Sequence, residues 1–288
     1  MPEIIALPVT AWQPTLDPAL QVSALRELES GNVLLLPQLP FELDGAELPL
    51  FDALPGDAKN ISWNATRGVR GVGPSGDPAM LQALLARYAG HTRSVLDALV
   101  PSYGNSLQQG NTSFRPVEIR DRTTSWRKDD TLLHIDSFPA SPTRGRRILR
   151  VFTNIHPHKT VRMWKLGSSF EELATRYASS VPALANASSP LLHWLGITKA
   201  RRSLYDWCML HIHDSMKADA RYQQQAAQAP HAFAPGQTWI AFTDQVTHAA
   251  LSGQHALEQT YLLPVDAMAM PARSPLAVLE RQIGRPLA

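Results

Sequence analysis

The spacing of apolar residues divides the chain into a helix-rich first part and a strand-rich second part. Apolar positions recur about every 3.6 residues in VSALRELE, and again from Asp77 to Val100, where Asp-Pro supplies a cap and a first turn. The glycine-rich segment between them, RGVRGVGPSGD, fits no phosphate-binding or dinucleotide-binding motif. We predict a surface or lid loop there, and a helical buttress and lid region over residues 1–105.

From Asn111 onwards, short β-branched or aromatic runs are separated by Pro, Gly, Asn and Asp, which indicates a β-rich unit. Strands are predicted near residues 112–120, 131–136, 148–155, 160–165, 238–243, 247–251 and 257–263. The segments SFEELATRYASS and SLYDWCMLHIHDSMKADARYQQQAAQ have helical periodicity and interrupt these strands. The pattern predicts a core over residues 106–270 with a helical insertion at about 169–230, followed by a C-terminal tail over 271–288.

Composition limits the class of protein. With 288 residues, 44% of them hydrophobic, the chain can bury the core of one large domain, and we predict a single domain over 1–288. The 27 basic and 25 acidic side chains nearly cancel, so no global field directs the protein to nucleic acid. The start, MPEIIALPVTAW, lacks the features of a secretory signal, and no window is apolar enough to span a membrane. We expect a cytoplasmic protein whose oligomeric state the sequence leaves open.

Two histidines and one aspartate are candidates for a metal site. The segment TLLHIDSFP places His134 and Asp136 two residues apart on a predicted strand, so both side chains emerge on one face. His248, on a late strand, supplies a third ligand, and the gap of 111 residues suits a barrel that closes on its own metal site. This donor set is the facial triad of non-haem Fe(II) oxygenases. Zinc hydrolases use the same ligand types, so the triad alone does not settle the metal.

The His-x-Asp pattern by itself is weak evidence, because roughly half of chains with this composition contain one by chance. A competing pair, His211 and His213, falls in a helical stretch, where a spacing of two does not share a face. We interpret these two as structural or surface histidines.

A 2-oxoglutarate enzyme must also neutralise the distal carboxylate of its cosubstrate, which requires an inward arginine or lysine. The segment ALEQTYLLP after His248 has no cation and places Gln259 there. In RILRVFTNIHP, alternation puts Arg150 and Asn154 on one face, and an arginine in such an apolar strand is costly to bury without an anion. Arg150 is therefore the predicted carboxylate clamp, with Asn154 and Gln259 as further cosubstrate-binding candidates.

Other strand residues are candidates for binding an acidic sugar. Arg162 and Trp164 share a face of KTVRMWKLG, and Arg115 lies in TSFRPVEI. Guanidinium groups pair with carboxylate or phosphate, and an indole packs against a sugar ring. The alternative is that Arg115 and Arg162 form ion pairs at a sheet edge, for example with Glu118 or Asp129. The arginines of SPTRGRR form a predicted loop cluster near the entrance, and Arg147 is its candidate substrate contact.

Three long stretches carry a family resemblance. They are SWRKDDTLLHIDSFPASPTRGRRILRVFTNIHP, YDWCMLHIHDSMKADARYQ and PGQTWIAFTDQVTHAALSGQHALEQTYLLP. These runs, together with the ending SPLAVLERQIGRPL, resemble the 3-deoxy-D-manno-oct-2-ulosonic acid (Kdo) 3-hydroxylase family from about Asn111 to the C-terminus, with a weaker match before it. Lys165 after Trp164, where arginine is expected, is a small departure.

The resemblance implies an α+β fold with a double-stranded β-helix core, jelly-roll and cupin-like, flanked by N-terminal and inserted helices. It implies an Fe(II)/2-oxoglutarate dioxygenase that uses O2, with ascorbate as reductant, and hydroxylates C3 of the outer Kdo of Kdo-lipid A. His134, Asp136 and His248 would be the metal ligands. The lipid substrate implies peripheral contact at the cytoplasmic face of the inner membrane. Two alternatives stay open: a cupin-like module that binds acidic sugars without turnover, and a JmjC-like hydroxylase of another substrate.

Overall fold

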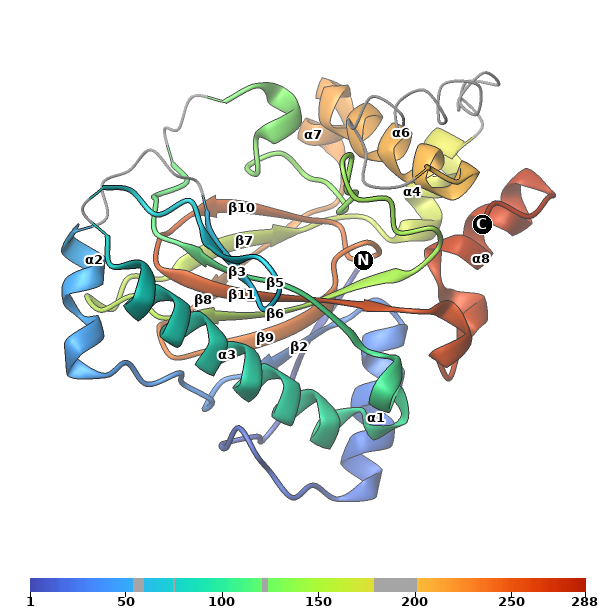
Figure 1. Cartoon of the computed structure of the whole chain (residues 1–288). Coiled ribbons are helices and arrows are strands. Elements are labelled where there is room, and N and C mark those ends of the chain that lie inside the picture. The colour runs from blue at the N-terminus through green and yellow to red at the C-terminus, as the bar shows by residue number, and fades with distance from the viewer. Residues whose placement is uncertain (54–59, 75, 121–123, 179–200) are drawn as a thin grey trace.

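Two β-sheets form the centre of the molecule, and helices lie on their outer sides (Figure 1). The computed structural model describes residues 1–53, 60–74, 76–120, 124–178 and 201–288. The larger sheet has eight strands in the order β1-β2-β9-β6-β11-β5-β3-β4, and the smaller has three in the order β10-β7-β8. The fold is thus a mixture of helix and sheet built on one large sheet, in agreement with the predicted class.

The strands of the larger sheet are β1 (Ile4–Ala6), β2 (Val33–Leu36), β3 (Ile61–Asn64), β4 (Gly68–Arg70), β5 (Gln108–Arg115), β6 (Arg147–Asn154), β9 (Thr238–Phe242) and β11 (Ala256–Leu263). Those of the smaller sheet are β7 (Arg162–Leu166), β8 (Ala229–Phe233) and β10 (His248–Ser252). The helices are α1 (Pro18–Glu29), α2 (Pro49–Ala53), α3 (Pro78–Leu99), α4 (Phe170–Tyr177), α6 (Leu204–Ala218), α7 (Ala220–Gln225) and α8 (Pro275–Ile283).

Alternation along the central strands directs side chains to opposite sides of the larger sheet. Leu149 and Val151 of β6 pack in a core that α1 and α3 cover, while Phe152 packs with Trp164 and Trp239 between the two sheets. A third core joins α4, α6 and α8 to the segment that carries Leu133. The space between the sheets is therefore apolar at one end, and the candidate metal ligands lie beside this apolar cluster.

The helix predictions are confirmed with their capping signals. The side chain of Asp77 accepts hydrogen bonds from the backbone amides of Ala79 and Met80 at the start of α3. The Ser169 side chain accepts from the Glu172 amide at the start of α4. These three bonds satisfy backbone donors that a helix terminus leaves without partners.

Several predictions about the first 105 residues and the C-terminal tail are corrected. Residues 1–105 are more than a helical buttress, because β1, β2, β3 and β4 of the larger sheet come from them. The glycine-rich segment is partly strand, since β4 pairs with β3 as a hairpin. The predicted tail contains α8, which packs with α4 and α6. Part of the predicted helical insertion, residues 179–200, lies outside the described residues.

The described helices also bear on membrane insertion. In the ranges given above, no helix is both long and apolar enough to cross a bilayer.

The connection between β10 and β11 buries a histidine in an unusual backbone conformation. His255 has a φ of 58°, in the left-handed region, and its ring lies against Phe51 and Phe114. The ring centroid of His156 is 4.9 Å away. Burial and then the neighbouring His156 lower the pKa of His255 to about 4.

This shift predicts a pH dependence of stability. The folded protein keeps His255 neutral down to about pH 4, whereas the unfolded chain protonates it near its ordinary pKa of about 6.5. The stability that this burial allows is thus present above about pH 6.5 and is lost as the pH falls toward 4. His255→Asn, which tolerates the left-handed backbone and does not titrate, should make the decline of the urea midpoint between pH 7 and 5 shallower. Identical slopes for the two proteins would contradict this assignment.

Candidate metal centre and its pocket

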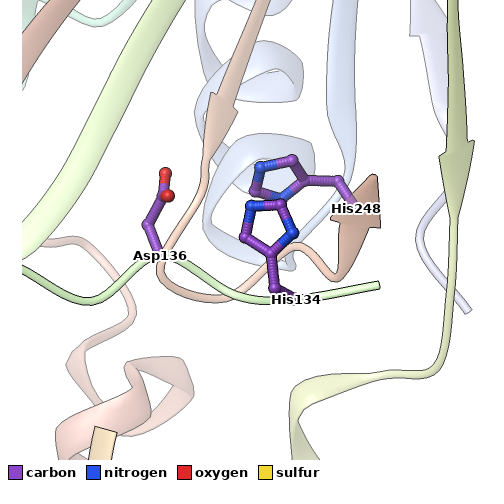
Figure 2. A group of neighbouring side chains, drawn as sticks. All are labelled: His134, Asp136 and His248. Carbon is purple, nitrogen blue, oxygen red and sulfur yellow. The ribbon is translucent and has the colours of Figure 1, made fainter. Parts of the chain in front are cut away.

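The three predicted metal ligands meet in the structure. One potential ligand atom from each of His134, Asp136 and His248 lies within 4.8 Å of the other two, and this is the cluster of such donors found in the described residues. Figure 2 shows the two imidazole rings side by side with the Asp136 carboxylate beside them. The alternative pair does not compete, because neither His211 nor His213 belongs to this cluster.

The backbone joins the two histidines directly. The amide of His134 donates to the carbonyl of His248 at 2.9 Å, and the amide of His248 donates back at 2.9 Å. This is an isolated antiparallel bridge, so the prediction of a full strand over residues 131–136 is corrected. Asp136 is fixed separately, through its amide, to the carbonyl of Thr243 at 2.7 Å.

Both imidazoles are held in the form that binds a metal. Nδ1 of His134 lies 2.8 Å from the carbonyl of Leu132, and Nδ1 of His248 lies 2.8 Å from that of Val246. A carbonyl only accepts, so each Nδ1 carries the proton and each Nε2 presents a lone pair. Burial lowers the pKa of both histidines, which keeps them neutral.

Asp136 completes the donor set as an ionised carboxylate. Its burial raises the pKa, but the pKa is nevertheless held well below its usual range, and the Arg150 guanidinium is the largest influence that lowers it. Among the described residues Oδ2 of Asp136 accepts no hydrogen bond, and Nε of Arg150 approaches it at 3.3 Å. A buried carboxylate oxygen without a hydrogen-bond donor, beside two neutral imidazoles, fits a divalent cation of the iron or zinc type.

A glutamine from α7 supports the segment that carries His134. Gln223 accepts a hydrogen bond from the Leu133 amide at 2.8 Å and donates to the Leu133 carbonyl at 3.0 Å, in the manner of a neighbouring strand. It also donates to the carbonyl of Met216 at 2.8 Å. The single bridge to His248 on one side and Gln223 on the other thus position His134.

Gln223→Ala is expected to weaken metal binding without removing a ligand. It leaves the Leu133 amide and carbonyl without this partner, and outer-shell changes of this kind typically cost about 10–100-fold in metal affinity. Anaerobic cobalt(II) titration, followed by absorbance, measures the effect. Gln224→Ala, on the exposed neighbouring position, is the matched control. Equal cobalt affinity of the two variants would show that Gln223 has no part in positioning His134.

Trp164 supports the site from the core and is not exposed to a sugar. Its ring stacks on His248 with 5.0 Å between centroids and 20° between planes. Only 2% of the side chain is exposed, and Phe152 and Trp239 pack around it. The prediction that Trp164 packs against substrate is therefore corrected: it fixes the imidazole plane of His248.

Charged side chains cross the space beside the metal ligands. Glu258 of β11 accepts from Arg115 at 2.6 Å and lies 3.1 Å from Nη1 of Arg150. Burial raises the pKa of Glu258, but Arg115 and Arg150 outweigh burial and lower it. The sequence analysis missed Glu258, although an acidic residue in the apolar strand ALEQTYLL was a signal for a buried cation nearby.

Arg162 lies deeper between the sheets than the other two arginines. Its Nη1 donates to the carbonyl of Gly253 at 3.0 Å, while its Nε has no hydrogen-bond partner among the described residues. Burial, and then the neighbouring Arg115, lower its pKa to about 10. The suggested edge pairs are not formed, because Arg115 pairs with Glu258 and no described carboxylate forms an ion pair with Arg162.

Three other predicted site residues, Asn154, Gln259 and Arg147, have structural roles inside the protein. Asn154 donates to the carbonyls of Thr160 and Phe233, and Gln259 accepts from Thr112, so the structure corrects both cosubstrate assignments. Both side chains are fully buried.

Arg147 is not at an entrance. It is fully buried, and its Nε donates to Asp244 at 2.8 Å while its guanidinium lies over the ring of Phe242. This ion pair explains why an arginine is tolerated inside the protein. The assignment of Arg147 to substrate binding is therefore corrected.

A pocket of about 570 Å³ opens from this charged group to the surface. It lies between β3, β5, β11 and the segment before β6, and Arg115, Arg150 and Glu258 are part of its wall. Because Arg150 also contacts Asp136, the inner end of the pocket adjoins the metal ligands. Its size and mixed lining are typical of small-molecule sites.

Comparison with known proteins identifies the family of the chain. The profile of the 3-deoxy-D-manno-oct-2-ulosonic acid (Kdo) hydroxylase family matches residues 11–286. The comparison with curated proteins found no match.

Solved structures of the Kdo hydroxylase KdoO, a non-haem Fe(II) α-ketoglutarate-dependent dioxygenase, are similar over the whole chain. The complex with α-ketoglutarate and Fe(III) is 44% identical, with 100% of this chain and 98% of that chain covered and a TM-score of 0.95. The cobalt(II) complex is 45% identical, with 99% and 97% covered and a TM-score of 0.94. The complex with succinate and Fe(III) is 43% identical, with 99% and 97% covered and a TM-score of 0.93. By the family profile and by this similarity, the chain belongs to the Kdo hydroxylase family.

Proposed function

We propose that the chain is an Fe(II)- and 2-oxoglutarate-dependent dioxygenase that hydroxylates C3 of the outer Kdo sugar of Kdo-lipid A. The observation that carries the proposal is the buried cluster of His134, Asp136 and His248, which adjoins an arginine-lined pocket in a member of this family. Two neutral imidazoles and one carboxylate bind Fe(II) and leave positions for other ligands.

Iron with 2-oxoglutarate and O2 would supply the oxidising chemistry, and the chain's own residues place and protect it. His134 and His248 present Nε2 because backbone carbonyls hold their Nδ1 protons. Arg150 keeps the Asp136 carboxylate ionised. The apolar residues around Trp164 shield the His248 side of the candidate site from water.

The proposed binding groups for the small acids are the interior arginines. Arg150 lines the pocket and lies beside a metal ligand, so we assign it to a carboxylate of 2-oxoglutarate. Arg115 lines the same pocket and is assigned to the carboxylate of the sugar. Arg162, whose Nε lacks a partner among the described residues, remains a further candidate for binding an acidic group.

The finer structural expectations belong to the same proposal. The larger and smaller sheets would be the two walls of a double-stranded β-helix in one domain over residues 1–288, with the core over 106–270. A glycolipid substrate places the enzyme at the cytoplasmic face of the inner membrane through peripheral contact. Ascorbate as reductant is a prediction of the same kind.

The test is succinate release by protein that has been loaded with Fe(II) anaerobically and then given O2, with and without Kdo-lipid A. Lipid-stimulated succinate, with a gain of one oxygen on the outer Kdo by mass spectrometry, is the expected result. Succinate formation that does not depend on the lipid would support the dioxygenase reaction but reject Kdo-lipid A as the substrate. The protein would then be a hydroxylase of another compound. Binding of acidic sugar without any succinate would favour a binding module.

A further inference from the structure

The pocket carries more positive charge than its buried carboxylate can balance. Among the described residues, four arginines line it, Arg67, Arg115, Arg146 and Arg150, together with one acidic residue, Glu258. Glu258 already forms ion pairs with Arg115 and Arg150 at the inner end. Arg67 and Arg146 are therefore left over, and neither forms an ion pair with a carboxylate in the described part of the chain.

These two arginines lie toward the mouth of the pocket. Arg67 is exposed and Arg146 is half-buried, whereas the Arg150 side chain is only 11% exposed. Arg67 lies in the turn between β3 and β4, and Arg146 is the residue before β6. Segments that are distant in the sequence thus bring two unneutralised guanidiniums to one opening.

Side-chain amides of β5 hold both guanidiniums in place. Nη2 of Arg67 donates to Oδ1 of Asn111 at 3.1 Å, and Nη1 of Arg146 donates to Oε1 of Gln108 at 2.6 Å. Nε of Arg146 also donates to the carbonyl of Thr143 at 2.9 Å. Neutral acceptors orient a guanidinium without cancelling its charge. Their anchors are three residues apart on β5, where the pairing of β5 with β11 shifts register.

We propose that Arg67 and Arg146 form a second oxyanion subsite, which binds a carboxylate or phosphate on the part of the glycan next to the sugar that is hydroxylated. The inference rests on the proposed function, because that function places an acidic sugar at the inner end. Amides and hydroxyls from Asn60, Asn64 and Ser113 line the wall between the two ends. The pocket therefore selects an oligosaccharide with at least two acidic groups.

A concave wall of this kind suits a glycan better than a lipid surface. Binding to a membrane plane uses exposed apolar side chains beside basic ones, whereas Arg67 and Arg146 border a hollow whose wall mixes polar and apolar residues. Charge-assisted hydrogen bonds to a guanidinium also orient the ligand, which a diffuse basic face does not do.

The experiment compares three ligands by calorimetry on protein loaded with cobalt(II) and 2-oxoglutarate under nitrogen. They are the methyl glycoside of Kdo, a Kdo–Kdo disaccharide with a second carboxylate, and Kdo linked to a phosphorylated hexosamine. At least one larger ligand should bind about tenfold more tightly than the methyl glycoside. Arg67→Gln and Arg146→Gln should each remove most of that gain and change methyl glycoside binding less than about twofold. Which larger ligand gains identifies the oxyanion as carboxylate or phosphate.

Two neighbouring arginines provide matched controls. Arg70→Gln changes the same hairpin as Arg67, and Arg144→Gln changes the same segment as Arg146, yet neither residue lines the pocket. Both controls should bind all three ligands as the unmodified protein does. Equal affinity for all three ligands, or unchanged disaccharide and phosphosugar binding in both pocket variants, would overturn the proposal. The proposal would also be overturned if Arg67→Gln and Arg146→Gln lost affinity only for anionic vesicles.

The outcome is separable from that of the proposed function. The same preparations, loaded with Fe(II) and exposed to O2, are assayed for succinate. Absence of succinate from the unmodified protein with Kdo-lipid A would reject the proposed function, while the calorimetric differences would still decide whether the subsite exists.

Discussion

Asp136→Ala is expected to abolish succinate formation, to less than about one thousandth of the unmodified rate. Metal-ion catalysis contributes several kcal/mol to such reactions, and each 1.36 kcal/mol is about tenfold in rate. The substitution removes the anionic member of the candidate ligand set and leaves two imidazoles beside Arg150. A cation would then face positive charge without a compensating carboxylate, so metal affinity and turnover should be lost together.

The fold should survive this change. Asp136 is positioned through its backbone amide, which the variant keeps, and Arg150 retains its ion pair with Glu258. Near-ultraviolet circular dichroism and the thermal midpoint measure the fold, and anaerobic cobalt(II) titration measures the site. Asp97→Ala, which removes an exposed carboxylate from α3, is the control. A folded Asp136→Ala protein with substantial succinate formation would refute the metal assignment. His134→Ala is expected to behave in the same way.

Arg150→Ala is expected to raise the 2-oxoglutarate concentration needed for half-maximal turnover by about 100-fold or more. Losing one partner of a buried ion pair costs about 3–5 kcal/mol, and each 1.4 kcal/mol corresponds to a tenfold change in affinity. The bound cosubstrate would stay beside the metal with one carboxylate left without its guanidinium. Titration of 2-oxoglutarate at saturating Fe(II) measures the change.

Arg150 also contacts Asp136, so metal binding must be measured separately from cosubstrate binding. Cobalt(II) affinity of the variant is therefore determined first, and the 2-oxoglutarate titration is run at metal saturation. Arg162→Ala is examined in parallel, and Arg144→Ala serves as an exposed control. If the 2-oxoglutarate concentration needed for half-maximal turnover rises steeply in Arg162→Ala and is unchanged in Arg150→Ala, the carboxylate is bound from β7 and not from β6.

The meeting of the candidate metal ligands was predictable in part because the geometry of two of them is local. His134 and Asp136 are two residues apart, and an extended backbone sends both to one side whether or not a regular strand forms. In the structure the bridge to His248 and the support of Gln223 position His134, and the bond from the Asp136 amide to the Thr243 carbonyl positions Asp136. The Gln223 contact was not predictable, because α7 meets the segment only through the tertiary fold.

The roles of the other polar residues depended on what faces each strand across the interior. Alternation assigns Arg147 and Trp164 to a side of their strands but does not say whether a pocket or a core lies there. In the structure Arg147 faces Asp244, and aromatic residues surround Trp164. Both side chains therefore lie in the core and not in a pocket. Short strands such as β1 and β4 were missed because three or four residues carry too little periodicity to detect.

The position of β11 bears on how the chain is made. It is the last strand along the chain, yet it pairs with both β5 and β6 in the middle of the larger sheet. On a ribosome, which adds roughly 5–20 residues per second, β5 and β6 emerge long before the strand that joins them. Each then has an exposed edge that can bind another nascent chain. Chaperone protection is thus needed most between the synthesis of β6 and β11, and the candidate metal cluster cannot assemble before His248 has been synthesised, just ahead of β11.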